Sequence, residues 1–375
     1  GATPLPIGHY TFTHALIREA LYEELTGPQR IRLHRKVAEV LQTTHGLAAD
    51  AHLPELAHHF FEAAPGGDVE RAIDYGVRAA EQALAHLAWE ESVAHYERVL
   101  QVEELAIPTD ETRRGDLTLG LAQALWRSGS YPRARETFHR VIDAARRLED
   151  GSLLARAVLG VGGWPKFRAD EPPGGPADEY RALLEEALAG VKEGELALRA
   201  RLLSQLAEQI SMEARESHSQ RAVALARESG DPDALFGALY SRLAALLGPD
   251  DIRRRFQVAT ELLDLAIRGR SKEKVFVARE SRIRSLMALG DLAGMDREID
   301  CCHDLAEELR VPIYRHSLAR FRMARALGDG RLKEAERLNH EILVLGGKAD
   351  DSSAELLIAM LTGWLHYLRG DLLST

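Results

Sequence analysis

Apolar residues recur along most of the chain at intervals of three and four, which is the spacing of an amphipathic helix. One such stripe follows Thr13, a residue suited to cap a helix, and joins Ala15, Leu16 and Ala20. Runs that alternate apolar and polar residues, as a half-buried strand would, do not exceed a few residues. The pattern therefore predicts an all-α protein.

Turn-forming residues divide this helical pattern into antiparallel pairs. The predicted pairs are 69–86 with 90–104, 112–128 with 132–148, 178–191 with 195–212, 216–229 with 233–247, 252–268 with 272–289, 292–309 with 312–328, and 332–345 with 353–369. Between the second and third pairs, the stretch 159–176 holds four prolines and five glycines. That composition predicts a long loop that interrupts the array.

A short phrase recurs at a fixed interval in the last third of the chain. It reads "LGDLAGMDREI" around Leu292, "GDGRLKEAERLNHEI" around Leu332 and "LRGDLL" around Leu372, so that its leucines lie 40 residues apart. Self-similarity at this period is typical of stacked helical hairpins. It predicts a solenoid, which grows by adding repeats and binds partners along an extended surface.

The repeats resemble tetratricopeptide repeats (TPRs). That family places a glycine at the turn, a large residue two positions later, a small residue three after that and an aromatic four further on. The matching residues are Gly129, Tyr131, Ala134 and Phe138 with small Ala122, then Trp89, Ser92 and Tyr96 with Ala80, then Gly290 and Leu292, and Gly330, Leu332 and Ala335. Met295 and Asn339 depart from the pattern. The resemblance implies a superhelical TPR-like solenoid, in which small residues let helices approach closely.

Composition and charge narrow the possible environments and partners. The 375 residues carry a formal net charge of −10, with a pI of about 5.9, which disfavours non-specific binding to nucleic acid. The cysteines, Cys301 and Cys302, are adjacent and predict a reduced protein of the cytoplasm. No apolar run reaches 18 residues, so no membrane association is expected.

Sequence motifs for catalysis or metal binding are missing. The stretch "LGGKAD" at 345–350 resembles a phosphate-binding loop, but Ile342 and Ala349 replace its first glycine and its hydroxyl residue. His58 and His59 are neighbours on a predicted helix, where their side chains diverge by about 100° and do not easily share one metal. The basic run Arg253–Arg255 is compatible with phosphate binding but fits a solvated helix surface better. We therefore predict no catalytic residue, no metal site and no enzymatic activity.

The first helix of each hairpin in a TPR array lines the binding groove. In the register above, the groove candidates are Gln123, Trp126, Arg127, Arg284, Met287, Arg320, Trp364 and Tyr367. Aromatic and arginine side chains are frequent anchors of binding surfaces. Packing of Trp126 and Trp364 on a neighbouring helix is an equally open alternative.

The order of segments resembles a junction in large bacterial signal-transduction ATPases of the STAND class, relatives of AAA+ proteins. The resemblance rests on "YTFTHALIREALYEEL" at 10–25, "QRIRLHRKVAEVL" at 29–41 and "LPELAHHFFEAAPGGDVERAIDYGVRAAEQAL" at 53–84. The class includes LuxR-type transcriptional regulators and cyclase–ATPase–TPR fusions, in which a nucleotide-binding module runs into a winged helix and then a TPR sensor. The resemblance implies the end of the winged-helix segment at 1–45, a linker helix and first TPR block at 46–158, a Pro/Gly-rich loop at 159–177, and a second TPR block at 178–375 that stops within a repeat.

This resemblance also implies a function. The chain would be a non-catalytic sensor region that binds an inducer, or a protein or peptide partner, and controls an upstream ATPase module. ATP or ADP is expected for the full-length protein and no cofactor for this chain. His14 matches a histidine that touches bound ADP in such switches, although Ala15 stands where the motif has an aspartate. The alternative is a generic TPR scaffold without an inducer. Direct nucleic-acid binding is not expected, despite a basic face at 30–36.

Overall fold

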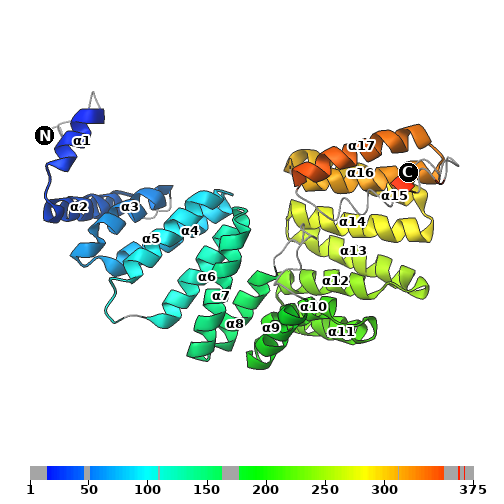
Figure 1. The fold of residues 1–375 in the computed structure, drawn as a ribbon, viewed down its shortest axis with the longest axis horizontal. Coiled ribbons are helices and arrows are strands. Elements are labelled where there is room, and N and C mark those ends of the chain that lie inside the picture. The colour runs from blue at the N-terminus through cyan, green and yellow to red at the C-terminus, as the bar shows by residue number, and fades with distance from the viewer. Residues whose placement is uncertain are drawn as a thin grey trace, which may run out of the picture. The chain divides into compact units, whose positions relative to one another are not determined.

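The computed structural model describes residues 15–45, 51–108, 110–162, 177–310, 312–349, 362–363 and 367. Within these ranges the chain forms seventeen α-helices and no strand, and most of the helices pack against the next one along the chain (Figure 1). The predicted all-α class is thereby confirmed. In the same ranges, none of the helices combines the length and apolar character that crossing a membrane requires.

Residues up to Ala144 form a first compact unit, unit 1. Its helices are α1 (Ala15–Glu23), α2 (Gly27–His45), α3 (Leu53–Ala63), α4 (Val69–Ala85), α5 (Trp89–Glu103), α6 (Glu111–Arg127) and most of α7 (Tyr131–Leu148). From α2 to α6, each helix packs on the next one along the chain. All four helices of the first two predicted hairpins therefore exist, with bounds within one residue of those predicted.

Residues from Ala145 form a second compact unit, unit 2. Its helices are α8 (Gly151–Val161), α9 (Ala177–Gly190), α10 (Leu196–Gln209), α11 (Met212–Ser229), α12 (Pro232–Ala245), α13 (Ile252–Arg268), α14 (Lys272–Leu289), α15 (Leu292–Leu309), α16 (Pro312–Gly328) and α17 (Leu332–Ala349). Each of these helices again packs on its successor.

Helix α8 is the element that the sequence analysis missed. It follows α7 after only Glu149 and Asp150, and its last residues occupy the start of the stretch predicted as a loop. Because α8 packs on α9, the first hairpin of unit 2 begins one helix earlier than predicted. Residues 163–176 and most of the predicted helix 353–369 lie outside the described residues. The predicted division into four segments stays a prediction.

The recurring phrase marks a helix-ending turn. Gly129, Gly290 and Gly330 adopt left-handed φ angles of 81°, 74° and 69°. In each turn the next amide donates to a carbonyl five residues back, as from Asp291 to Leu286 O at 3.0 Å and from Arg331 to Ala326 O at 2.9 Å. This geometry closes a helix and favours glycine, which has no Cβ to clash. The periodic glycine is therefore required by the backbone of the hairpin.

We expect Gly290→Ala to lower the free energy of unfolding by about 1 kcal/mol. An added Cβ at Gly290 would meet nothing within 4 Å, so the cost comes from the left-handed φ alone. Gly328→Ala is the matched control, because Gly328 also has open space but ends a helix without a left-handed φ. Urea denaturation of the two variants checks the difference, and equal effects would contradict it.

The residues of the repeats that match the TPR pattern form part of the packed core. Ala80, Ala122 and Ala134 have no exposed surface, and Phe138 is 1% exposed. Met295, which departs from the TPR pattern, is nevertheless buried in the core of the α14–α15 hairpin. The TPR-like packing expected from the small and large positions is therefore present.

Candidate functional site

The predicted groove residues fall on three helices of the two units. Gln123, Trp126 and Arg127 lie on α6 in unit 1, Arg284 and Met287 on α14, and Arg320 on α16 in unit 2. Tyr367 is exposed, while Trp364 and His14 lie outside the described residues. The structure gives these residues positions, and their role in binding stays a prediction.

On α6 the aromatic candidate packs locally. Trp126 is half-buried, with its ring 4.9 Å from the ring of Tyr131 in an edge-to-face arrangement. The guanidinium of Arg127 lies 5.5 Å from the centre of the Trp89 ring, and Gln123 is exposed. Trp126 therefore contacts the helix that follows it, which is the arrangement described by the alternative in which Trp126 packs on a neighbouring helix.

On α14 and α16 a set of polar and aromatic side chains comes together around Arg284. Arg284 forms an ion pair with Glu280, one helical turn away. Ser317 Oγ donates to Glu280 Oε1 at 2.9 Å, and the Arg284 guanidinium lies 5.6 Å from the centre of the Phe321 ring. Arg284 thus contacts side chains of its own helix, α14, and of α16, the first helix of the next hairpin.

Two further helices contribute to this surface. Burial and the charge of Glu280 raise the pKa of Tyr240 on α12, with a further increase from Glu208 on α10 and an opposing effect from Arg284. Tyr240 is therefore within electrostatic range of all three charged groups. The first helices α10, α12, α14 and α16 supply neighbouring side chains in chain order.

Arg255, in the first turn of α13, is the unusual member of the set. Its Nε is buried, and no described residue offers it a hydrogen-bond acceptor. Burial, followed by the positive charge of Arg284, lowers the pKa of Arg255. A half-buried guanidinium whose Nε has no acceptor favours an incoming anion. Within the run 253–255, Arg253 and Arg254 are exposed, as expected for a solvated surface.

We refer to Glu208, Tyr240, Arg255, Glu280, Arg284, Ser317 and Phe321 as the Arg284 surface. Met287 lies on α14 beside Arg284 with 45% of its surface exposed, and Arg320 precedes Phe321 on α16. The sequence analysis named Arg284, Met287 and Arg320 as groove candidates, named Arg255 only as part of a basic run, and did not name Tyr240. The proximity of Arg255 to Arg284 depends on the packing of α13 on α14, which the sequence does not give.

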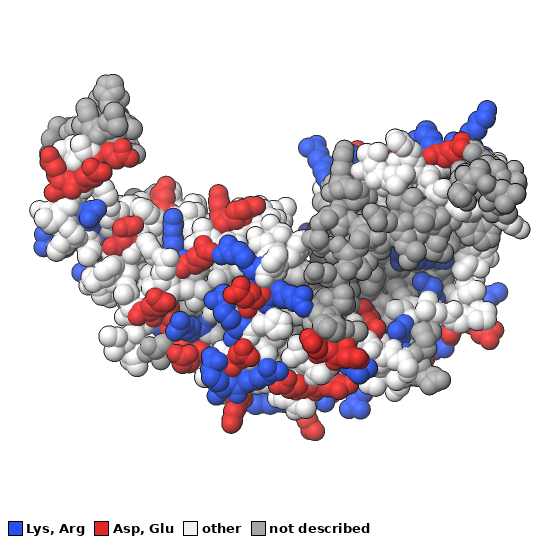
Figure 2. All heavy atoms as spheres, in the orientation of Figure 1, with Lys and Arg blue, Asp and Glu red and all other residues white. Residues whose placement is uncertain are grey.

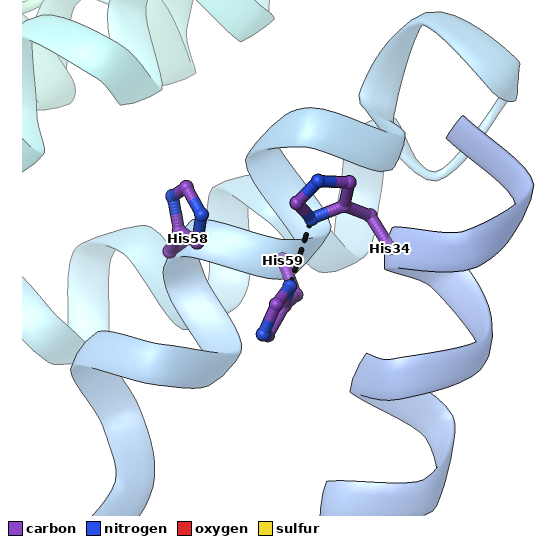
Figure 3. A group of neighbouring side chains, drawn as sticks. All are labelled: His34, His58 and His59. Atoms are coloured by element: carbon purple, nitrogen blue, oxygen red, sulfur yellow. Dashed lines mark hydrogen bonds between the residues drawn. The ribbon is translucent and has the colours of Figure 1, made fainter. Parts of the chain in front are cut away.

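Unit 1 contains a group of three histidines, of which the sequence analysis considered only His58 and His59. His34 on α2 faces His58 and His59 on α3 (Figure 3). Burial lowers the pKa of His34, although the charge of Glu62 opposes the shift. Burial also lowers the pKa of His59, with further lowering from His34 and His58. The imidazoles of His34 and His59 therefore favour the neutral form.

Charge on the outer surface is mixed. Figure 2 shows acidic and basic side chains interleaved over the described part of the face drawn, without a continuous basic stripe there. Many charged side chains of the described residues are paired, as Arg146 with Glu186 at 2.7 Å and Arg227 with Glu261 at 2.7 Å. Interleaved charge of this kind keeps a surface solvated.

Comparisons with known proteins identify the fold and not a family. No family model matches the chain, and no curated protein matches it. A STAND protein with a tetratricopeptide repeat sensor from Pyrococcus horikoshii is similar in structure, with a TM-score of 0.54 and 12% identity over 92% of this chain and 53% of that one. A Rap protein complexed with Competence and Sporulation Factor is also similar, with a TM-score of 0.55 and 10% identity over 86% of this chain and 98% of that one.

These likenesses confirm a TPR-like helical solenoid. The chain spans about half the length of the STAND protein that it matches.

Proposed function

We propose that this chain is the sensor region of a larger signalling protein and that its Arg284 surface binds an acidic segment of a protein or peptide partner. The observation that carries the proposal is the buried, acceptor-free Nε of Arg255 beside Arg284. Around this pair, the solenoid offers the extended surface on which repeat proteins bind their partners.

Arg255 is the group of the Arg284 surface that favours an anion. Glu280 compensates Arg284, whereas none of the described residues forms an ion pair with Arg255. A carboxylate of the partner that pairs with Arg255 would gain charge-assisted hydrogen bonds, each worth about 1.5–3 kcal/mol. Met287 and the Phe321 ring supply apolar contact next to this charge. The same chemistry would suit a small inducer with a carboxylate.

The larger protein is proposed as a STAND-type ATPase switch, such as a LuxR-type regulator of transcription in the cytoplasm. The similarity to a STAND protein that is about twice as long supports this, together with the junction-like segments at 10–84. ATP or ADP would bind in the upstream module, with His14 near the nucleotide, and this chain alone would bind no nucleotide. The partner would act by preferring one of two conformations of the switch.

Selection of peptides from a random display library tests the binding surface. We expect the selected peptides to share an Asp, a Glu or a free terminal carboxylate. Arg255→Gln should weaken the best of them at least about tenfold, since one charge-assisted hydrogen bond exceeds 1.4 kcal/mol. Fluorescence anisotropy gives the affinities. Arg337→Gln is the control, because Arg337 is an exposed arginine on α17.

Other results would reject parts of the proposal. Peptides without acidic groups, or affinities unchanged by Arg255→Gln, would reject the Arg284 surface as the binding site. Isothermal titration that detects micromolar ATP binding to this chain would contradict a separate nucleotide module. Capture of one protein partner, with no stabilisation by any small molecule in a thermal-shift screen, would favour the scaffold over an inducer sensor.

A further inference from the structure

We propose that His34, His58 and His59 form a binding site for a divalent transition-metal ion, with Zn²⁺ as the ion that fits best. The site lies in unit 1 and is independent of the partner-binding surface proposed above. It joins two helices, since His34 comes from α2 and the other two from α3.

The three side chains already lie at near-ligating distances. One ring nitrogen from each histidine lies within 4.8 Å of one from each of the others. The Nδ1 atoms of His34 and His59 are 2.8 Å apart, and the centre of the His34 ring is 5.5 Å from that of His58. Nitrogens bound to one tetrahedral zinc lie about 3.4 Å apart, given Zn–N bonds of about 2.1 Å. Small side-chain rotations therefore suffice to complete the site.

The position of His34 explains why neighbours on one helix can share an ion here. His58 and His59 diverge around α3, but the His34 ring reaches over that helix towards both of them (Figure 3). His34 is buried, His59 half-buried and His58 exposed. A metal would thus have a fixed ligand inside and an open approach from the solvent. Three protein ligands leave the fourth position to water.

Tyr22 supports the innermost ligand. Its hydroxyl lies 2.9 Å from His34 Nε2, the ring nitrogen opposite the one that faces His59. When Nδ1 of His34 binds the ion, Nε2 carries the hydrogen and donates it to the Tyr22 oxygen. Metal-bound histidines usually donate their second ring hydrogen in this way, which fixes the orientation of the ring. Imidazole ligands suit zinc, copper and nickel, whereas magnesium and calcium prefer oxygen.

The chelator-treated chain titrated with Zn²⁺ in a calorimeter tests the proposal. We expect one ion per chain with a micromolar or tighter Kd. His34→Gln and His58→Gln should each weaken binding by at least about 100-fold, since loss of a mere supporting group costs 10–100-fold. Tyr22→Phe should weaken it about tenfold by releasing the His34 ring. His86→Gln, an exposed histidine elsewhere in unit 1, should change nothing.

Two outcomes would overturn the proposal. One is Zn²⁺ binding that is equally tight in the wild type and in His58→Gln, which would place the ion elsewhere. The other is a wild-type Kd weaker than millimolar, which would leave the three histidines as a hydrogen-bonded cluster. Because His58 is exposed, His58→Gln preserves the fold, and circular dichroism of each variant verifies this.

Discussion

Glu298→Ala is expected to lower the free energy of unfolding of unit 2 by about 3–5 kcal/mol. Glu298 on α15 accepts from Arg279 at 2.5 Å and from Arg282 at 2.8 Å, both on α14. The side chains are 10%, 21% and 19% exposed, so solvent screens them little. Removing the carboxylate leaves two largely buried guanidinium groups facing each other. That cost exceeds the value of an ordinary ion pair.

Urea denaturation followed by circular dichroism measures the effect, and an exposed pair provides the control. Arg337 and Glu341 lie one turn apart on α17 at 3.3 Å, with side chains 67% and 44% exposed. Glu341→Ala should therefore cost no more than about 0.5 kcal/mol. A combined Arg279→Met, Arg282→Met and Glu298→Leu variant should recover most of the loss. Equal costs for Glu298→Ala and Glu341→Ala would contradict the argument.

Local signals in the sequence were sufficient to predict where most helices begin and end. Helix α6 begins at a capping aspartate, Asp110, and ends before Gly129, whose left-handed φ closes the hairpin. Both signals are visible in the residues themselves. Helix α8 was missed although it too begins at a capping aspartate, Asp150. It is only 11 residues long and runs into the Pro/Gly-rich stretch that begins at 159, whose composition predicted a loop.

The candidate sites depended on contacts between distant residues. His34 and His59 are hydrogen-bonded although 25 residues separate them, and Arg255 lies near Arg284 through the pairing of α13 with α14. A repeat pattern predicts which helix follows which, but it does not give the rotation of each side chain about its helix. The sequence therefore identified Arg284 as a surface residue and did not identify the unpaired cation beside it.

Phe138→Ala should lower the free energy of unfolding of unit 1 by about 3–5 kcal/mol. Phe138 occupies the aromatic position of a TPR-like repeat and is 1% exposed on α7. Its neighbours one turn away on the same face, Ala134 and Val141, have no exposed surface. Loss of the ring removes buried apolar contact and leaves a cavity that the closely packed helices fill only in part.

Asn339→Ala tests whether the stability lost in Phe138→Ala depends on the position within the repeat motif or on how deeply the side chain is buried. Asn339 occupies the same position in the α16–α17 repeat, but it is only half-buried. Its Nδ2 donates to Thr362 Oγ1 at 2.9 Å. Its Oδ1 is buried, and none of the described residues donates a hydrogen bond to it. The variant loses one hydrogen bond and also removes one unsatisfied oxygen, so its net cost should stay below about 1 kcal/mol. Urea denaturation compares the two variants. A similar loss for both would mean that the motif position itself sets the stability, whereas the expected threefold or larger difference assigns it to burial.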